Sequence, residues 1–123
     1  MARNFKRLEV WNLGYDLVLD FYKLIEKFPE YEKDNLISQI RRASTSIPLN
    51  IAEGCSRQSK KSFLQFFIYA YGSCKELTVL LMLSRDFKYI SEEVYEDMDE
   101  KVDKLSRKLF VFIKEAGDSE FFQ

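Results

Sequence analysis

Apolar side chains recur at three- and four-residue steps through four separate stretches of the chain. Because an α-helix has about 3.6 residues per turn, this spacing places the apolar residues of each stretch on one face. The pattern predicts helices at about 6–28, 34–56, 60–85 and 92–116. Amphipathic helices of similar length joined by short loops favour an all-α fold, an antiparallel up-down-up-down four-helix bundle. We expect this bundle to occupy residues 1–123 as a single domain.

Helix-capping and helix-breaking residues set the predicted ends of these helices. Pro29 should stop the first helix, because proline disfavours a helical conformation of the residue before it. Asp34, Ser59 and Ser91 are residues of the kind that cap helix N-termini, so we expect them at the starts of the other three helices. The tail after the fourth helix carries Phe121–Phe122, for which the pattern predicts no partner.

Short loops also predict a register between the second and third helices. Folding the chain back about a turn near 58–59 places Ser44 level with Ser73 and Arg41 level with Glu76. In the same register Cys55 and Cys74 lie roughly 18 Å apart along the axis, at about 1.5 Å rise per residue. That separation exceeds the reach of a disulfide, so we expect two reduced thiols.

The composition removes most catalytic and metal-binding classes. The chain of 123 residues contains no histidine, which is the commonest general base and transition-metal ligand. Acids of the fourth helix fall largely outside its apolar stripe, which is typical of a solvated face. No glycine-rich phosphate loop occurs. We therefore predict no catalytic residue, no metal site and no cofactor, and hence no enzyme.

The two cysteines give little support to nucleophilic catalysis. Cys74 lies on the apolar face of the third helix, where a buried thiol without a base is inert. Cys55 is expected to be more exposed, with Arg57 and Lys60 near enough to favour its thiolate. The alternative is an ordinary cysteine at a helix end.

The stretch 38–57 combines small residues, an interior proline and three arginines. Pro48 lacks a backbone donor and should bend the helix. Glu53 and Arg57 are four residues apart in the favourable order for an ion pair, and Arg41 opposite Glu76 would make a second pair between helices. On this interpretation the charges only lock the second helix against the third.

The alternative interpretation gives the basic residues a ligand. Arg41, Arg42, Arg57, Lys60 and Lys61 would then meet phosphates of a nucleic acid or contact a nucleoprotein partner. The net charge of −1, from 19 basic and 20 acidic residues, provides no global attraction to nucleic acid. Symmetric assembly would multiply this cluster, because each subunit adds its copy.

Three stretches of the chain resemble a known bacterial family. They are LEVWNLGYDL, IEKFPEYEKDNLISQIRRASTSIPLNIAEG and RQSKKSFLQFFIYAYGSCKEL, and together they resemble the family of the 23S rRNA intervening-sequence protein. The resemblance implies a four-helix bundle that assembles as a ring-like homopentamer, without enzymatic activity. The chain is also similar to the accessory variability protein of diversity-generating retroelements, which associates with nucleic acid.

Residues that match the family motif are concentrated in the second and third helices. The motif residues with an expected structural role are Gln39, Ser46, Pro48, Asn50, Glu53, Gly54, Ser73 and Glu76. Other matching positions are Arg41, Arg42, Ala43, Ile47, Ile51, Ala52, Arg57 and Gly72. The chain departs from many relatives at Ser62, where they carry a glutamate, and it is acidic overall.

These observations give two hypotheses for function. The first is a non-enzymatic homo-oligomer, a pentamer by resemblance, that binds RNA, DNA or a nucleoprotein partner through the basic surface of its second and third helices. The second is a protein-interaction scaffold whose charges serve folding and assembly. We expect no small-molecule substrate and no membrane partner, since no apolar run looks long enough to span a bilayer. The expected location is the cytoplasm.

Overall fold

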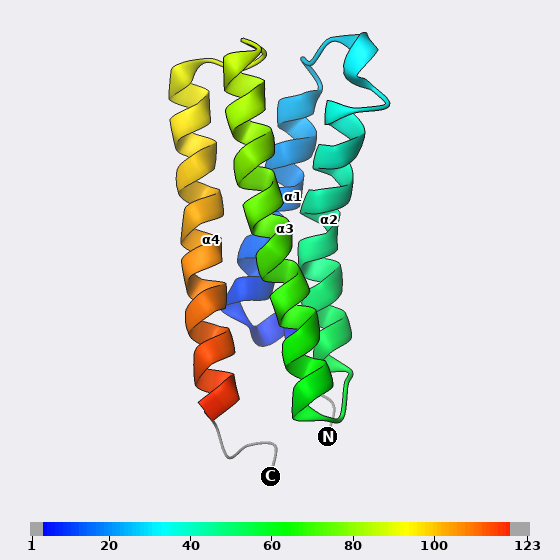
Figure 1. Ribbon diagram of the computed structural model, residues 1–123, viewed down its shortest axis with the longest axis vertical. Coiled ribbons are helices and arrows are strands. Elements are labelled where there is room, and N and C mark those ends of the chain that lie inside the picture. The colour runs from blue at the N-terminus through cyan, green and yellow to red at the C-terminus, as the bar shows by residue number, and fades with distance from the viewer. Residues whose placement is uncertain (1–3, 119–123) are drawn as a thin grey trace.

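Four antiparallel helices form the part of the chain that the structure describes (Figure 1). The computed structural model describes residues 4–118, and the Phe121–Phe122 tail lies outside them. The helices are α1 (Glu9–Ile25), α2 (Leu36–Cys55), α3 (Lys60–Asp86) and α4 (Glu92–Asp118), with 3-10 turns η1 (Phe5–Arg7) and η2 (Glu30–Glu32). Each helix runs opposite to the one before it, which confirms the up-down-up-down bundle.

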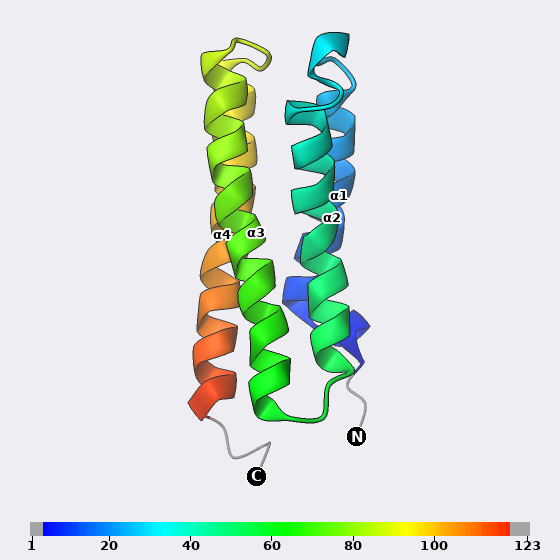
Figure 2. The same cartoon turned by 45° about the vertical axis from the view of Figure 1, so that its right-hand side comes forward.

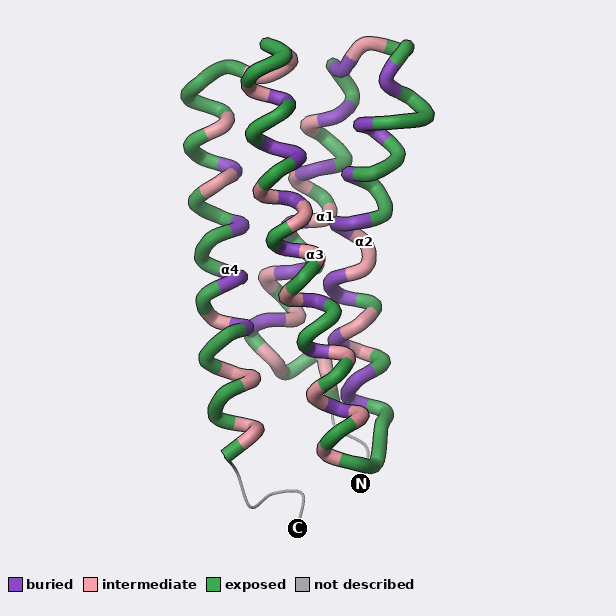
Figure 3. The backbone as a smooth tube through the Cα atoms, viewed as in Figure 1, coloured by how far each residue is buried: buried purple, intermediate pink, exposed green. Residues whose placement is uncertain are grey.

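The apolar stripes of the four helices meet in one core. Figure 3 shows the buried positions turned inward along every helix. Phe63, Phe67 and Phe112 stack in this core, with ring centroids 4.6 Å apart for Phe63–Phe67 and 4.7 Å for Phe67–Phe112. Phe67 has no solvent exposure. This one contiguous core provides the hydrophobic stabilisation of the bundle.

The predicted helix starts are confirmed at two of three positions. The Ser59 hydroxyl accepts from the backbone N–H of Ser62 at 3.1 Å, and the Ser91 hydroxyl accepts from that of Val94 at 3.1 Å. Asp34 is not the cap of α2, because the residue before Leu36 is Asn35. The Asn35 side chain makes no capping bond and instead accepts from the Gln39 amide at 2.6 Å.

The predicted bounds of the first helix were wrong at both ends. The chain at Leu8 is extended (φ −81°, ψ 129°), so α1 begins at Glu9 and not near Lys6. At the other end the regular helix stops at Ile25, because Glu26 and Phe28 donate to carbonyls three residues back rather than four. The helix thus tightens into a turn before Pro29 is reached.

Two loops lie at the end of the bundle opposite the α2–α3 turn (Figure 2). The buried Glu32 carboxylate, in η2, accepts from the Tyr89 hydroxyl of the α3–α4 loop at 2.7 Å. Hydrogen bonds with Tyr31 and Glu32 raise the pKa of Tyr89. Lys88, beside Tyr89, has φ 65°. Its N–H donates to the Arg85 carbonyl and the Tyr89 N–H donates to the Ser84 carbonyl, which are the two backbone bonds of a Schellman motif.

Candidate functional site

Arg41 and Arg42 lie on α2 but point toward different neighbours. The Arg42 guanidinium donates to the Glu76 carboxylate of α3, forming an ion pair. The Arg41 guanidinium lies 6.0 Å from the centre of the Tyr22 ring of α1. The predicted pair between Arg41 and Glu76 was therefore wrong by one residue.

Arg57, Lys60 and Lys61 gather at the α2–α3 turn. Arg57 donates to Glu53 at 3.0 Å, which confirms the predicted pair, and its guanidinium lies 4.6 Å above the Phe66 ring. Lys60 and Lys61 make no ion pair with any residue between 4 and 118. These three cations occupy one end of the bundle.

The structure does not bring the five basic residues into one patch. Arg42 and Arg57 lie about 22 Å apart along the axis of α2, at roughly 1.5 Å per residue. Arg41 and Arg42 therefore belong to a different part of the surface from the α2–α3 turn cluster, which we define as Arg57, Lys60 and Lys61. A ligand that contacts both groups would have to run along most of α2.

The motif residues of the α2–α3 contact bond mainly to each other and to the helix backbone. The Ser46 and Ser73 hydroxyls share a hydrogen bond across the two helices, where the predicted register had placed Ser44. Ser46 also bonds to the Ala43 carbonyl at 2.8 Å, and the Asn50 amide donates to the Ser46 carbonyl at 2.7 Å. These contacts make this part of the motif structural.

Close packing explains two further motif positions. A Cβ on Gly54 would lie 2.9 Å from Cε1 of the buried Phe67 ring, so no side chain fits there without displacing it. Pro48 lies inside a continuous α2, and its Cδ would lie 3.8 Å from a Cβ added to Gly14 of α1. The proline therefore packs close to Gly14 of α1.

Neither cysteine is placed for chemistry. The expected exposure of Cys55 was wrong, because only 1% of that residue is exposed. Burial raises the pKa of Cys74 to about 12, so its thiol stays protonated at neutral pH. Cys74 is a free thiol. Among residues 4–118, no three His, Cys, Asp or Glu side chains group closely enough to hold a metal ion.

An exposed apolar stripe on α3 was not recognised as a site in the sequence. Ile68, Val79 and Leu83 recur at helical spacing on its outer side and are 47%, 55% and 37% exposed. Gly72 lies on the same side, where an added Cβ would meet nothing within 4 Å. The outer α3 face, defined by these four residues, is an exposed surface with three apolar side chains, and the exposed Lys75 lies on the same side between Gly72 and Val79. The signal was present, because apolar residues surround α3 on all sides.

The composition of α3 corrects one expectation about membranes. Within the described residues, α3 is the one helix that is long and apolar enough to cross a bilayer, with a third of its most apolar window buried. The core helix of a soluble protein can pass the same test. Here α3 packs between α2 and α4 in the bundle.

Comparisons with known proteins agree with this architecture. No curated protein matched the chain. A solved structure from Bacteroides thetaiotaomicron VPI-5482, a protein with unknown function from the S23 ribosomal protein family, is 25% identical with a TM-score of 0.79. The match covers 85% of this chain and 95% of that chain. The family model of the 23S rRNA-intervening sequence protein matches residues 6–111. The chain therefore belongs to the 23S rRNA-intervening sequence protein family.

Proposed function

We propose that this protein is a non-enzymatic helix-bundle module that self-associates through the outer α3 face. The observation that carries the proposal is the row of Ile68, Val79 and Leu83, each more than a third exposed. An apolar row of this kind is unusual on a monomer and is typical of an interface. The open position at Gly72 allows a neighbouring backbone to approach closely.

Sedimentation velocity at micromolar concentration tests this assembly. We expect the wild-type protein to sediment as an oligomer, and the ring of five implied by the family resemblance is the expected size. Val79→Glu with Leu83→Glu should yield folded monomers, because both side chains are exposed in the protomer and their burial would be lost.

A matched control replaces two exposed apolar residues on another helix. Tyr15 and Leu19 of α1 are 49% and 57% exposed, so Tyr15→Glu with Leu19→Glu should leave the oligomer intact. A wild-type monomer at micromolar concentration would contradict the proposal. Flotation of the wild-type protein with phosphatidylcholine vesicles would instead assign the outer α3 face to lipid.

A second candidate function is nucleic-acid binding at the α2–α3 turn cluster. It is favoured by the aromatic rings beside these cations: Phe66 and Tyr69 pack edge to face with centroids 5.7 Å apart and line a cavity of about 260 Å³ with Lys61. Basic side chains next to exposed rings suit single strands, where phosphates meet cations and bases stack. Each subunit of an oligomer would add one such cluster.

Fluorescence anisotropy with structured RNA and with single-stranded DNA, across a salt series, tests this second function. Lys60→Ala with Lys61→Ala should weaken binding and lower the salt slope by about 1.4–1.8 if both lysines contact phosphates. Arg41→Ala with Arg42→Ala, about 22 Å away along α2, is the matched control and should have little effect. Absence of binding at low salt would rule this function out.

A further inference from the structure

A groove follows the line where α1 and α4 lie side by side. Three cavities of about 410, 270 and 590 Å³ lie along it in that order. The first and second share Lys104, and the second and third share Asp20 and Lys101. The three cavities therefore adjoin one another along this contact, and together we call them the α1–α4 groove.

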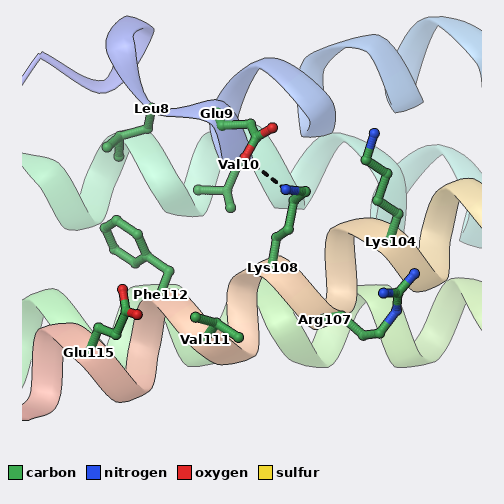
Figure 4. A pocket seen from close by; sticks show the side chains of 9 residues that line it. All are labelled: Leu8, Glu9, Val10, Lys104, Arg107, Lys108, Val111, Phe112 and Glu115. Atoms are coloured by element: carbon green, nitrogen blue, oxygen red, sulfur yellow. Dashed lines mark hydrogen bonds and ion pairs between the residues drawn. The ribbon is translucent and has the colours of Figure 1, made fainter.

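The floor of the α1–α4 groove is apolar. Figure 4 shows Leu8 and Val10, at the start of α1, across from Phe112 of α4 in the first cavity. Leu13 and Leu17 line the second cavity. Leucine, isoleucine and methionine side chains continue this floor in the third: Leu24, Ile90 and Met98. From Val94 to Val111 the groove is about 26 Å long, which is the length of a helix of about 17 residues.

The groove lining carries a small excess of basic residues, six against five acidic ones. Lys101 bridges Asp20 at 3.2 Å and Asp97 at 3.5 Å, and Lys108 contacts Glu9 at 3.0 Å, so two lysines pair with three acids inside the groove. Lys23, Lys27 and Lys104 also line the groove, and they make no ion pair with any other residue that the structure describes. Against these three cations stand Asp16 and Glu115, the two lining acids with no ion pair in the same range. The third cavity, which carries Lys23 and Lys27, has no such acid.

We propose that the α1–α4 groove binds an amphipathic helix of a partner protein, with its apolar side on the groove floor and acidic residues against Lys23, Lys27 and Lys104. A helix in a groove buries leucine-type anchors at positions i, i+3 or i+4, and i+7, which suits an apolar floor of this length. Complementary charge at the rim selects a partner of opposite charge and speeds its association with the groove. No residue of the outer α3 face lines the groove, so this contact is separate from the proposed self-association.

A designed peptide of about 18 residues tests the inference on the intact protein. The peptide carries leucines at helical spacing and glutamates elsewhere, and a control peptide carries lysines in place of the glutamates. By fluorescence anisotropy we expect the acidic peptide to bind and the basic peptide to bind at least about ten-fold more weakly. Equal binding of the two peptides would overturn the inference.

Two variants locate the binding. Lys23→Glu with Lys27→Glu should weaken binding of the acidic peptide at least about ten-fold. Lys60→Glu with Lys61→Glu, a matched lysine pair outside the groove, should leave that binding unchanged. Val111→Asp introduces a charge at a side chain that is half exposed, so the fold should tolerate the substitution. Binding of the acidic peptide should be lost. The same loss from both lysine pairs would show attraction to general positive charge. A change in sedimentation of Val111→Asp alone would assign the groove to a second copy of the chain. Either result contradicts the inference.

Discussion

The α2–α3 contact is closed by small side chains, whereas the α1–α4 contact is spanned by long ones. In the first, Ser46 and Ser73 share a hydrogen bond and Gly54 lies directly against the Phe67 ring. In the second, Lys101 and Lys108 reach across to acids of α1, and a groove remains along the contact. Helix separation depends on the side chains at the contact, so residue size alone accounts for much of this difference.

The comparison separates positions that hold the fold from positions that are available to partners. Motif residues such as Ser46, Asn50 and Gly54 are engaged at the closed contact by hydrogen bonds or packing. Unpaired lysines remain at the open contact, beside apolar side chains that are buried or half-buried. The family motif therefore lies mainly where helices are joined, and candidate binding surfaces lie mainly outside it.

The accessibility of thiols should differ most strongly between the two regions. Cys55 and Cys74 are 1% and 0% exposed, so alkylation of either requires the bundle to open. Lys104→Cys introduces a thiol into the α1–α4 groove at an exposed position. With iodoacetamide at pH 8, we expect the new thiol to react at least about 1,000-fold faster than Cys55 or Cys74. Mass spectrometry of the folded protein counts the labels, and rapid labelling of wild type would show that the core is open.

Cys74 also predicts a loss of stability at high pH. Its pKa rises from 9.0 to about 12 on folding, so the folded state holds the proton more tightly than the unfolded state. The stability linked to this proton is fully present below pH 9. As pH rises from 9 to 12 it is lost, and the free energy of unfolding falls by about 4 kcal/mol in all. Denaturant titrations of wild type and Cys74→Ala across this pH range isolate the effect of Cys74, because all other titratable groups are present in both proteins. Parallel pH curves for the two proteins would contradict the burial of this thiol.

Gly54 tests how tightly the α2–α3 contact is closed. Gly54→Ala places a Cβ 2.9 Å from Cε1 of Phe67, a ring held by stacking on Phe63 and Phe112. We expect a loss of about 1–3 kcal/mol in the free energy of unfolding, measured in urea at fixed protein concentration. Gly117→Ala in α4 is the matched control: its Cβ would lie 3.9 Å from Leu64, so the change should be neutral or stabilising by up to about 1 kcal/mol.

The sequence predicted elements well because each helix carries its own signal. Apolar periodicity located all four helices, and the hydroxyls of Ser59 and Ser91 marked two of their starts. Register was harder, since one residue turns a side chain about 100° around the helix axis. Arg41 is at nearly the right level for Glu76 but faces Tyr22 of α1, and Arg42 makes the pair instead.

Features that depend on contacts between distant segments carried no local signal. Glu32 and Tyr89 lie in different loops, and neither residue type indicates that they meet. Lys88 occupies a left-handed position where glycine is the usual marker. Cys55 opens a polar run that suggested the surface, yet its side chain turns into the core. The α1–α4 groove depends on how far two helices separate, which no stretch of sequence encodes by itself.

The smallest expected effect concerns the lysine bridge of the open contact. The hydrogen bond to Asp20 raises the pKa of Lys101, so the bridge is complete below the ordinary lysine pKa near 10.4 and weakens as pH rises through the raised value. Lys101 is nearly half exposed, so a double-mutant cycle of Lys101→Ala and Asp20→Ala should give a coupling of only about 0.2–1 kcal/mol. The coupling should shrink toward zero in 1 M salt, where the Debye length is about 3 Å. A coupling that survives high salt would mean that the α1–α4 contact excludes water as the α2–α3 contact does. That result would contradict an open groove between α1 and α4.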